Sequence, residues 1–199
     1  MSSGDLAYIS AAKLAAMIRA RDISATEVMR VTLARAEKGN AALNCFITIC
    51  ADEALRDAAA ADAAIARREP VGPLHGVPLH VKDLVNTKGV RTTFASAMYE
   101  HNVPAVDAVS VARLKQAGAI LMGKTTTPEF GHMPYTEAPL FGRTRNAWAA
   151  DRTSGGSSGG AGVALAAGLC AIGVGTDAGG STRIPAAANG VVGFKRCAA

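Results

Sequence analysis

The sequence predicts a layered α/β fold. Residues 1–70 carry helical patterns with capping signals, and the rest alternates short apolar runs with Gly, Pro and one further helical pattern. Glycine is concentrated near the end, where 12 of the 21 glycines lie between residues 155 and 193. With 199 residues, 49% apolar and 19% charged, the chain can bury a core.

Three helices are predicted within residues 1–70. The segment Ser24-Ala25-Thr26-Glu27 is a capping box, so we expect a helix over 25–38 with Gly39 as its end. Ser10 can cap an earlier helix, and the alanine-rich stretch 52–68 forms a third. We expect residues 1–70 to pack as a helical region on a core formed by residues 71–199.

The remaining elements are predicted from short apolar runs. Residues 45–49, 77–81 and 119–122 are expected to form strands, and residues 109–116 a helix. This alternation is typical of βαβ units.

Composition excludes several classes of function. No stretch reaches the ~18 to 20 apolar residues of a membrane span, and the N-terminus lacks a signal-peptide pattern, so we expect a soluble, cytoplasmic protein without a membrane partner. The four cysteines form no C-x-x-C pair, so reduced thiols are expected. The net charge of +5 is spread along the chain, which argues against direct binding of nucleic acid. No metal or cofactor site is predicted.

Three motif matches are rejected on physical grounds. Residues 118–125 fit the Walker A expression, but the intervening Ala-Ile-Leu-Met favours a buried strand over a phosphate loop. Residues 155–159 fit the G-x-S-x-G elbow, but all four histidines precede Ser157 and no strand comes before the motif. Residues 173–178 fit the dinucleotide fingerprint without its acidic residue about 20 positions on.

Two serine-bearing, glycine-flanked turns remain, at 155–160 and 179–181. An apolar helix over 162–171 and a return strand at 172–175 would let these turns face each other. A serine hydroxyl needs a base, and no histidine stands in suitable order, so Lys82 is the candidate because it closes an apolar strand. Burial lowers the pKa of lysine and leaves a neutral amine near pH 7.

At this point the sequence resembles the amidase signature family. The resemblance covers nearly the whole chain and is carried by five segments: GGSSGG at 155–160, GTDAGGSTRIPA at 175–186, GVVGFK at 190–195, GVPLHVKD at 76–83 and LFGRTRN at 140–146. It implies a mixed central sheet covered by helices on both faces and hydrolysis of small aryl or aliphatic amides.

The resemblance implies a role for each matching residue. Ser181 would be the nucleophile, Ser157, preceded by a cis peptide bond, the proton relay, and Lys82 the base. The interval between Ser157 and Ser181 is the family's own spacing. Further roles fall to flanking residues: the backbone N–H groups of Ala178, Gly179, Gly180 and Ser181 as oxyanion donors, Asp177 paired with Arg183, Ser154, Ser158 and Thr176 as hydrogen-bonding supports, and Gly131, His132 and Met133 at the acyl pocket.

The chain also departs from the family pattern. Family members are more than twice as long, and here Gly193-Phe194-Lys195 is followed by only four residues. We therefore expect a truncated form with weak or absent activity. The alternatives to a stand-alone amidase, which could form a homodimer, are the glutaminase subunit of a tRNA-dependent amidotransferase, an inactive fragment, or a binding module that retains the pocket.

Overall fold

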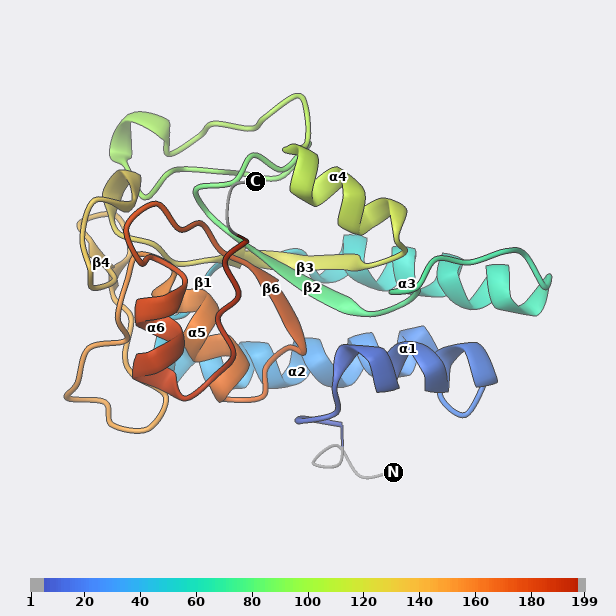
Figure 1. Cartoon of the computed structure of the whole chain (residues 1–199). Coiled ribbons are helices and arrows are strands. Elements are labelled where there is room, and N and C mark those ends of the chain that lie inside the picture. The colour runs from blue at the N-terminus through green and yellow to red at the C-terminus, as the bar shows by residue number, and fades with distance from the viewer. Residues whose placement is uncertain (1–5, 197–199) are drawn as a thin grey trace.

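The computed structural model describes residues 6–196. Figure 1 shows a central sheet with helices on both sides. Its four strands follow the order β1-β3-β2-β6 and comprise β1 (Phe46–Ile49), β3 (Ile120–Thr125), β2 (Pro78–Lys82) and β6 (Ile172–Val174). Strand β1 runs antiparallel to β3, whereas β2 runs parallel to both β3 and β6. The predicted mixed α/β sheet is confirmed.

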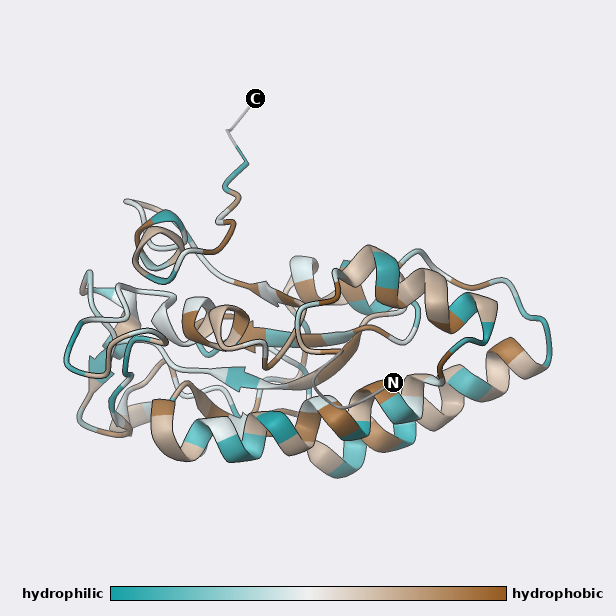
Figure 2. Cartoon of the chain, turned by 90° about the horizontal axis from the view of Figure 1, so that it is seen from below, coloured by the Kyte–Doolittle hydropathy of each residue, from teal (hydrophilic) through white to brown (hydrophobic). Residues whose placement is uncertain are grey.

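Three helices precede β2, as the two capping signals and the alanine-rich stretch predict. They are α1 (Ala11–Ala20), α2 (Ala25–Leu43) and α3 (Ala51–Ala66). The Ser10 hydroxyl accepts the Lys13 N–H at 3.3 Å, and the Ser24 hydroxyl accepts the Glu27 N–H at 3.0 Å. Figure 2 shows hydrophobic and hydrophilic residues alternating around these helices, as expected of helices with one buried face.

Helix α2 does not end at Gly39, and that prediction is wrong. The helix continues to Leu43 and is capped by Asn44 in the left-handed conformation. A Cβ atom on Gly39 would lie 2.9 Å from Cδ2 of Leu169, so this glycine lets a buried leucine approach the helix closely. A glycine inside a helix costs about 1 kcal/mol, which burial of the leucine offsets.

The two faces of the sheet bury separate apolar clusters. One cluster joins α1, α2 and α3 to Met122 of β3 and to Val163 of α5 (Gly159–Ala166). On the opposite face, Leu79 and Val81 of β2 pack with Val111 of α4 (Val109–Gln116). In Figure 1, α4 accordingly lies on the other side of the sheet from α1 and α2. The predicted division at residue 70 stays a prediction.

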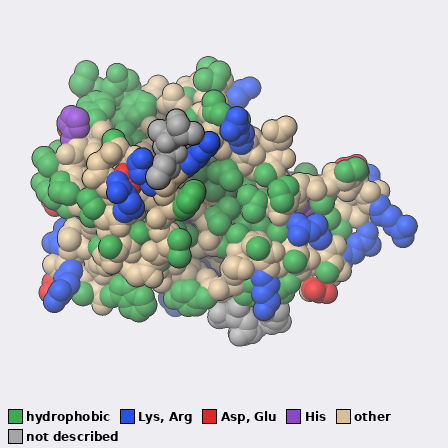
Figure 3. All heavy atoms as spheres, viewed as in Figure 1, with side chains coloured by type: hydrophobic (Ala, Val, Ile, Leu, Met, Phe, Trp, Pro, Cys, Tyr) green, Lys and Arg blue, Asp and Glu red, His purple; other side chains and the backbone are tan. Residues whose placement is uncertain are grey.

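The predicted helix 162–171 is shifted in the structure. Helix α5 begins at Gly159 and ends at Ala166, because Gly168 adopts a φ of 63° and Leu169 N donates back to Ala164 O. The chain then returns through β6 to α6 (Arg183–Asn189). Strand β6 pairs only with β2 among the described strands, and Figure 3 shows hydrophobic side chains gathered on this face between the α6 region and α4.

Two short 3₁₀ helices and two short strands complete the secondary structure of residues 6–196. They are η1 (Ala97–Tyr99), η2 (Glu129–Gly131), β4 (Glu137–Ala138) and β5 (Gly142–Arg143).

The rejected motifs have structural explanations. The Walker-like stretch contains β3, and every residue of that strand is buried. Gly173 lies within β6, where a Cβ atom would collide with the imidazole ring of His80. The lack of a side chain at Gly173 therefore makes room for the His80 ring, and no nucleotide is needed to explain this glycine.

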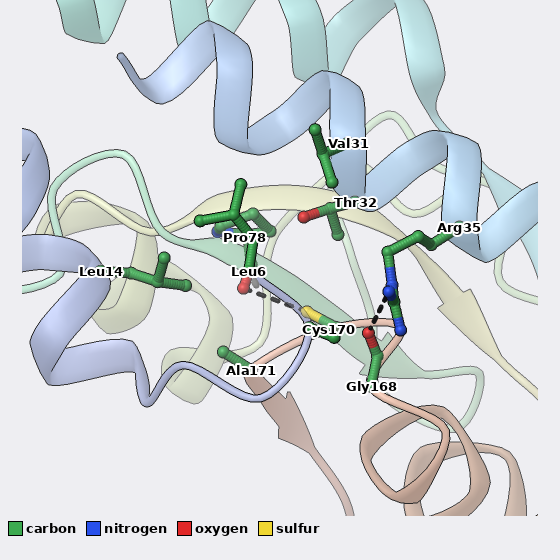
Figure 4. A pocket seen from close by; sticks show the side chains of 10 residues that line it. Leu6, Leu14, Val31, Thr32, Arg35, Pro78, Gly168, Cys170 and Ala171 are labelled. Atoms are coloured by element: carbon green, nitrogen blue, oxygen red, sulfur yellow. Dashed lines mark hydrogen bonds between the residues drawn. The ribbon is translucent and has the colours of Figure 1, made fainter. Parts of the chain in front are cut away.

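The cysteines at 45, 50 and 170 are buried free thiols, and Cys197 lies outside the described residues. The Cys170 thiol donates to Pro78 O at 3.2 Å beside a small cavity of about 10 Å³, roughly the space of one water (Figure 4). At the same place the Arg35 Nε donates to Gly168 O at 3.1 Å and ties α2 to the α5–β6 connection. None of the helices in residues 6–196 has the length and apolar character that a membrane crossing requires.

Candidate active site

Lys82 lies at the carboxyl end of β2 with its side chain fully buried. Its Nζ donates to the Ser157 Oγ at 2.6 Å and to the Thr176 Oγ1 at 2.8 Å. The two partners come from loops 75 and 94 residues farther along the chain. The fold therefore brings the predicted lysine and the predicted relay serine into direct contact.

The surroundings of Lys82 favour the neutral amine. Burial lowers the pKa of Lys82 from 10.5 to about 7, and the negative charge of Asp177 raises it by a smaller amount. Near neutral pH a substantial fraction of Lys82 is uncharged and carries a lone pair that can accept a proton.

Ser157 is buried in a tightly packed glycine turn. The Gly156–Ser157 peptide bond is cis, as the resemblance implies, and Gly155 has a φ of 70°. A Cβ atom on Gly156 would lie 2.7 Å from Tyr135 N and 2.8 Å from Met133 O. Only glycine fits at position 156, because the backbone of the 133–135 loop presses directly against it.

Ser181 is tied to this turn through its backbone. Its carbonyl oxygen accepts the N–H of Ser158 at 3.0 Å, which places the two serine turns side by side. Within residues 6–196 the Ser181 hydroxyl makes no hydrogen bond with Ser157. The structure therefore joins Lys82, Ser157 and Thr176 directly and holds Ser181 beside them.

The predicted oxyanion donors are the backbone N–H groups of the turn 178–181, which carries Ser181. The Gly180 N–H donates to Asp177 Oδ1 at 2.7 Å. The N–H groups of Ala178, Gly179 and Ser181 have no acceptor in the described part of the chain, and Gly179 is exposed. Three of the four predicted donors are thus available to a ligand.

Asp177 and Arg183 pair as predicted. The Arg183 Nε and Nη2 donate to the two carboxylate oxygens at 2.9 Å each. Asp177 Oδ2 also accepts the Thr182 N–H at 3.2 Å. These hydrogen bonds, with that from Arg183 the strongest, lower the pKa of the Asp177 carboxyl. The charged pair fixes both ends of the turn that carries Ser181.

The predicted supporting residues make local hydrogen bonds. The Ser158 Oγ bridges the carbonyl and the N–H of Thr176, each at 3.3 Å, so it aligns the residue whose hydroxyl contacts Lys82. The Ser154 Oγ donates to Gly155 O at 3.1 Å.

The predicted pocket residues divide between two places. A Cβ atom on Gly131 would lie 3.2 Å from Ser157 Oγ, so Gly131 forms a wall of the serine site. His132 and Met133 line an open depression of about 650 Å³ that is bordered neither by Lys82 nor by Ser157. Contact of His132 and Met133 with a substrate stays a prediction.

Two supporting residues escaped the sequence analysis. The Thr136 Oγ1 donates to Gly155 O at 2.9 Å and accepts the Gly159 N–H at 3.1 Å. Asn189, fully buried, donates to Ser154 O at 2.8 Å and to Pro185 O at 2.9 Å. A single threonine in a loop and an asparagine before a glycine carry no periodic signal, so sequence alone could not identify them.

Potential metal ligands do not gather at the site. No group of three or more His, Cys, Asp or Glu side chains within 6–196 is placed to hold a metal ion.

Comparisons with known proteins show the family of the chain. The family model described as Amidase matches residues 27–197. The chain is 46% identical over 191 residues to the A subunit of the glutamyl-tRNA(Gln) amidotransferase of Acidothermus cellulolyticus and 48% identical over 180 residues to that of Desulforapulum autotrophicum. These alignments cover 96% and 90% of this chain but only 38% and 36% of the relatives.

Solved structures of two amide-cleaving enzymes have a similar fold. A fatty acid amide hydrolase superposes with a TM-score of 0.89 and 33% identity, over 93% of this chain and 33% of that one. A bacterial aryl acylamidase superposes with a TM-score of 0.88 and 34% identity, over 92% of this chain and 38% of that one.

Proposed function

The chain belongs to the amidase family, and we propose that its site hydrolyses an amide by acyl transfer through Ser181. The observation that carries the proposal is the 2.6 Å contact between the buried Lys82 amine and the Ser157 hydroxyl. Because the chain spans less than two-fifths of the length of its curated relatives, we propose this chemistry for the site and for the whole protein to which such a site belongs.

The proposed reaction begins with two proton transfers. The neutral amine of Lys82 takes the proton of the Ser157 hydroxyl, which takes the proton of Ser181 after the Ser181 side chain turns toward it. The Ser181 oxygen then bonds to the amide carbon, and free N–H groups of the 178–181 turn receive the negative charge that develops on the carbonyl oxygen. One such donor contributes about 2.7 to 4 kcal/mol in the transition state.

Collapse of this intermediate breaks the C–N bond. The leaving nitrogen receives the proton held by Lys82 by way of Ser157, and an amine or ammonia departs. Water then attacks the Ser181 ester, loses a proton along the same route and releases the carboxylic acid, while Ser181 regains its hydrogen. The net change is one amide and one water to one acid and one amine.

Phosphonylation by a fluorophosphonate tests the nucleophile, because a single attack on phosphorus with loss of fluoride suffices even where turnover is slow. We expect mass spectrometry to locate the adduct on Ser181. Labelling is expected to disappear in Ser181→Ala and to persist in Ser110→Ala, which removes an exposed hydroxyl on α4. An adduct on another serine, or undiminished labelling of Ser181→Ala, would refute the assignment.

A second candidate is hydrolysis of glutamine. The two curated relatives described above are amidotransferase subunits. Their similarity to this chain supports glutamine as the substrate. We propose that the glutaminase form would act with partner subunits, whereas a stand-alone amidase would act alone or as a homodimer. Release of ammonia from glutamine, compared with release of nitroaniline from acyl nitroanilides, separates the two. The predicted cytoplasmic location stays a prediction.

A further inference from the structure

A second fully buried lysine lies beside Lys82. Lys124 stands on β3 opposite Val81, one position before the Lys82–Thr125 pair of the parallel ladder. Neither the proposed chemistry nor the rejected Walker A match accounts for it. A buried ammonium group is costly unless its hydrogens are bonded and its charge is balanced, so its partners indicate what it does.

The Nζ of Lys124 is fully engaged by the segment that follows β2. It donates to Val85 O at 2.6 Å, to Thr92 Oγ1 at 2.8 Å and to Thr87 Oγ1 at 2.9 Å. All three acceptors lie in the loop 83–93 that begins directly after Lys82. One amine on β3 thus fastens the start and the end of this loop.

Asp83, the residue next to Lys82, supplies the opposite charge. Its Oδ1 lies 4.0 Å from the Lys124 Nζ, and neither side chain is exposed. Its Oδ2 accepts both the N–H of Thr93, at 2.9 Å, and the Thr93 hydroxyl, at 2.5 Å. The buried pair therefore anchors the loop at its first residue and again at Thr93.

From Thr93 the contacts continue to the other half of the site. The Phe94 N–H donates to Asp83 O at 3.1 Å, and Phe94 O accepts the Phe130 N–H at 2.9 Å. Phe94 and Phe130 have φ values of 53° and 50°, a conformation that bulky residues adopt only where surrounding contacts enforce it. Phe130 precedes Gly131, whose backbone lies against the Ser157 hydroxyl.

We propose that the buried Lys124–Asp83 pair positions the catalytic machinery by holding the end of β2 at Lys82 and, through Phe94 and Phe130, the Gly131 wall at Ser157. The inference rests on the proposed function and extends it. Lys124 is a positioning residue, because its amine bonds to neither Lys82 nor Ser157. Loss of the pair releases the end of β2, so Lys82 regains water and its hydrogen bond to Ser157 weakens.

Lysine side-chain NMR reads this effect without an activity assay. In protein labelled with ¹⁵N-lysine, the Nζ signal of Lys82, assigned with Lys82→Arg, titrates with a midpoint that reports its burial. We expect a midpoint near pH 7 in the wild-type protein and a rise by about one unit or more, toward the usual 10.4, in Lys124→Met. Lys115→Met is the matched control, since Lys115 on α4 forms a partly exposed pair with Asp107 and its loss is expected to leave the Lys82 midpoint unchanged.

A milder variant covers the case in which Lys124→Met fails to fold. Thr92→Val removes one acceptor of the Lys124 amine and keeps the β-branched shape, so a smaller rise in the Lys82 midpoint is expected together with faster exchange of the Phe130 amide proton. Unchanged Lys82 midpoint and Phe130 exchange in a folded Thr92→Val or Lys124→Met protein would overturn the proposal. If the Lys82 midpoint shifts in these variants but the wild-type protein never reacts with fluorophosphonate, the role of the Lys124–Asp83 pair in positioning Lys82 is supported and the proposed function is refuted.

Discussion

Replacing Lys82 with methionine is expected to stabilise the fold at neutral pH while removing reactivity. Lowering the lysine pKa from 10.5 to about 7 corresponds to about 5 kcal/mol of cost for burying its charge, at 1.36 kcal/mol per unit. Methionine fills a similar volume without this cost, but it leaves the buried Ser157 hydroxyl without its donor, at about 1 to 3 kcal/mol, whereas the partly exposed Thr176 hydroxyl can bond to water instead. A net gain of at least about 2 kcal/mol follows.

The sign of the pH dependence is fixed by the same pKa. Between pH 7 and about 10.4 the unfolded chain holds a proton on Lys82 that the folded chain has lost, so the stability of the wild-type protein rises with pH in this window. Below pH 7 the full cost of burial is present. The advantage of Lys82→Met is therefore largest at and below pH 7, shrinks by about 1.36 kcal/mol per pH unit above it, and is lost before the pH reaches 10.4, because the variant still lacks the hydrogen bond to Ser157.

Urea unfolding at several pH values between 6 and 10 measures this difference, with Lys88→Met, at an exposed position, as the control. A gain of about 2 kcal/mol corresponds to roughly 4 to 8 °C in Tm for a chain of this size. A Lys82→Met protein that is less stable than wild type at pH 6 to 7, or a difference that does not change with pH, would refute the reasoning.

Two other substitutions probe the frame around the serine turns. Asp177→Asn keeps the shape but removes the charge that pairs with Arg183, so we expect labelling of Ser181 by fluorophosphonate to slow at least about tenfold. Little change in Tm is expected, because the pair is largely exposed on the arginine side. An unchanged labelling rate would contradict this role. Asn189→Ala leaves the buried carbonyl of Ser154 without its donor, and we expect urea unfolding to show a loss of about 2 to 3 kcal/mol; a loss below about 0.5 kcal/mol would show that the hydrogen bond is not needed.

Local signals in the sequence predict much of the fold. Ser10 and Ser24 mark true helix starts, and residues 109–116 form the helix that their pattern predicts. Gly39 misleads because its role depends on Leu169, a contact far along the chain that no local pattern contains. The rejection of the Walker A match rests on the apolar stretch before Lys124, which is a buried strand in the structure.

The site, too, is predicted only where a local signal in the sequence marks it. Glycine enrichment indicates the serine turns, and the end of an apolar strand makes Lys82 a candidate base that the resemblance then supports. The contact between Thr176 and Lys82 and the support from Thr136 and Asn189 arise only when distant loops meet. The Lys124–Asp83 pair is hidden for another reason, since a buried charge looks like a surface charge in a sequence.

The rate at which Ser181 reacts with fluorophosphonate, measured against pH in the wild-type, Lys82→Arg and Ser157→Ala proteins, tests the central claim most directly. A relay through Ser157 to a neutral Lys82 predicts a wild-type rate that rises through about pH 7, and near-complete loss of reaction in both variants. A pH-independent rate, or a Ser157→Ala protein that reacts as fast as wild type, would contradict it.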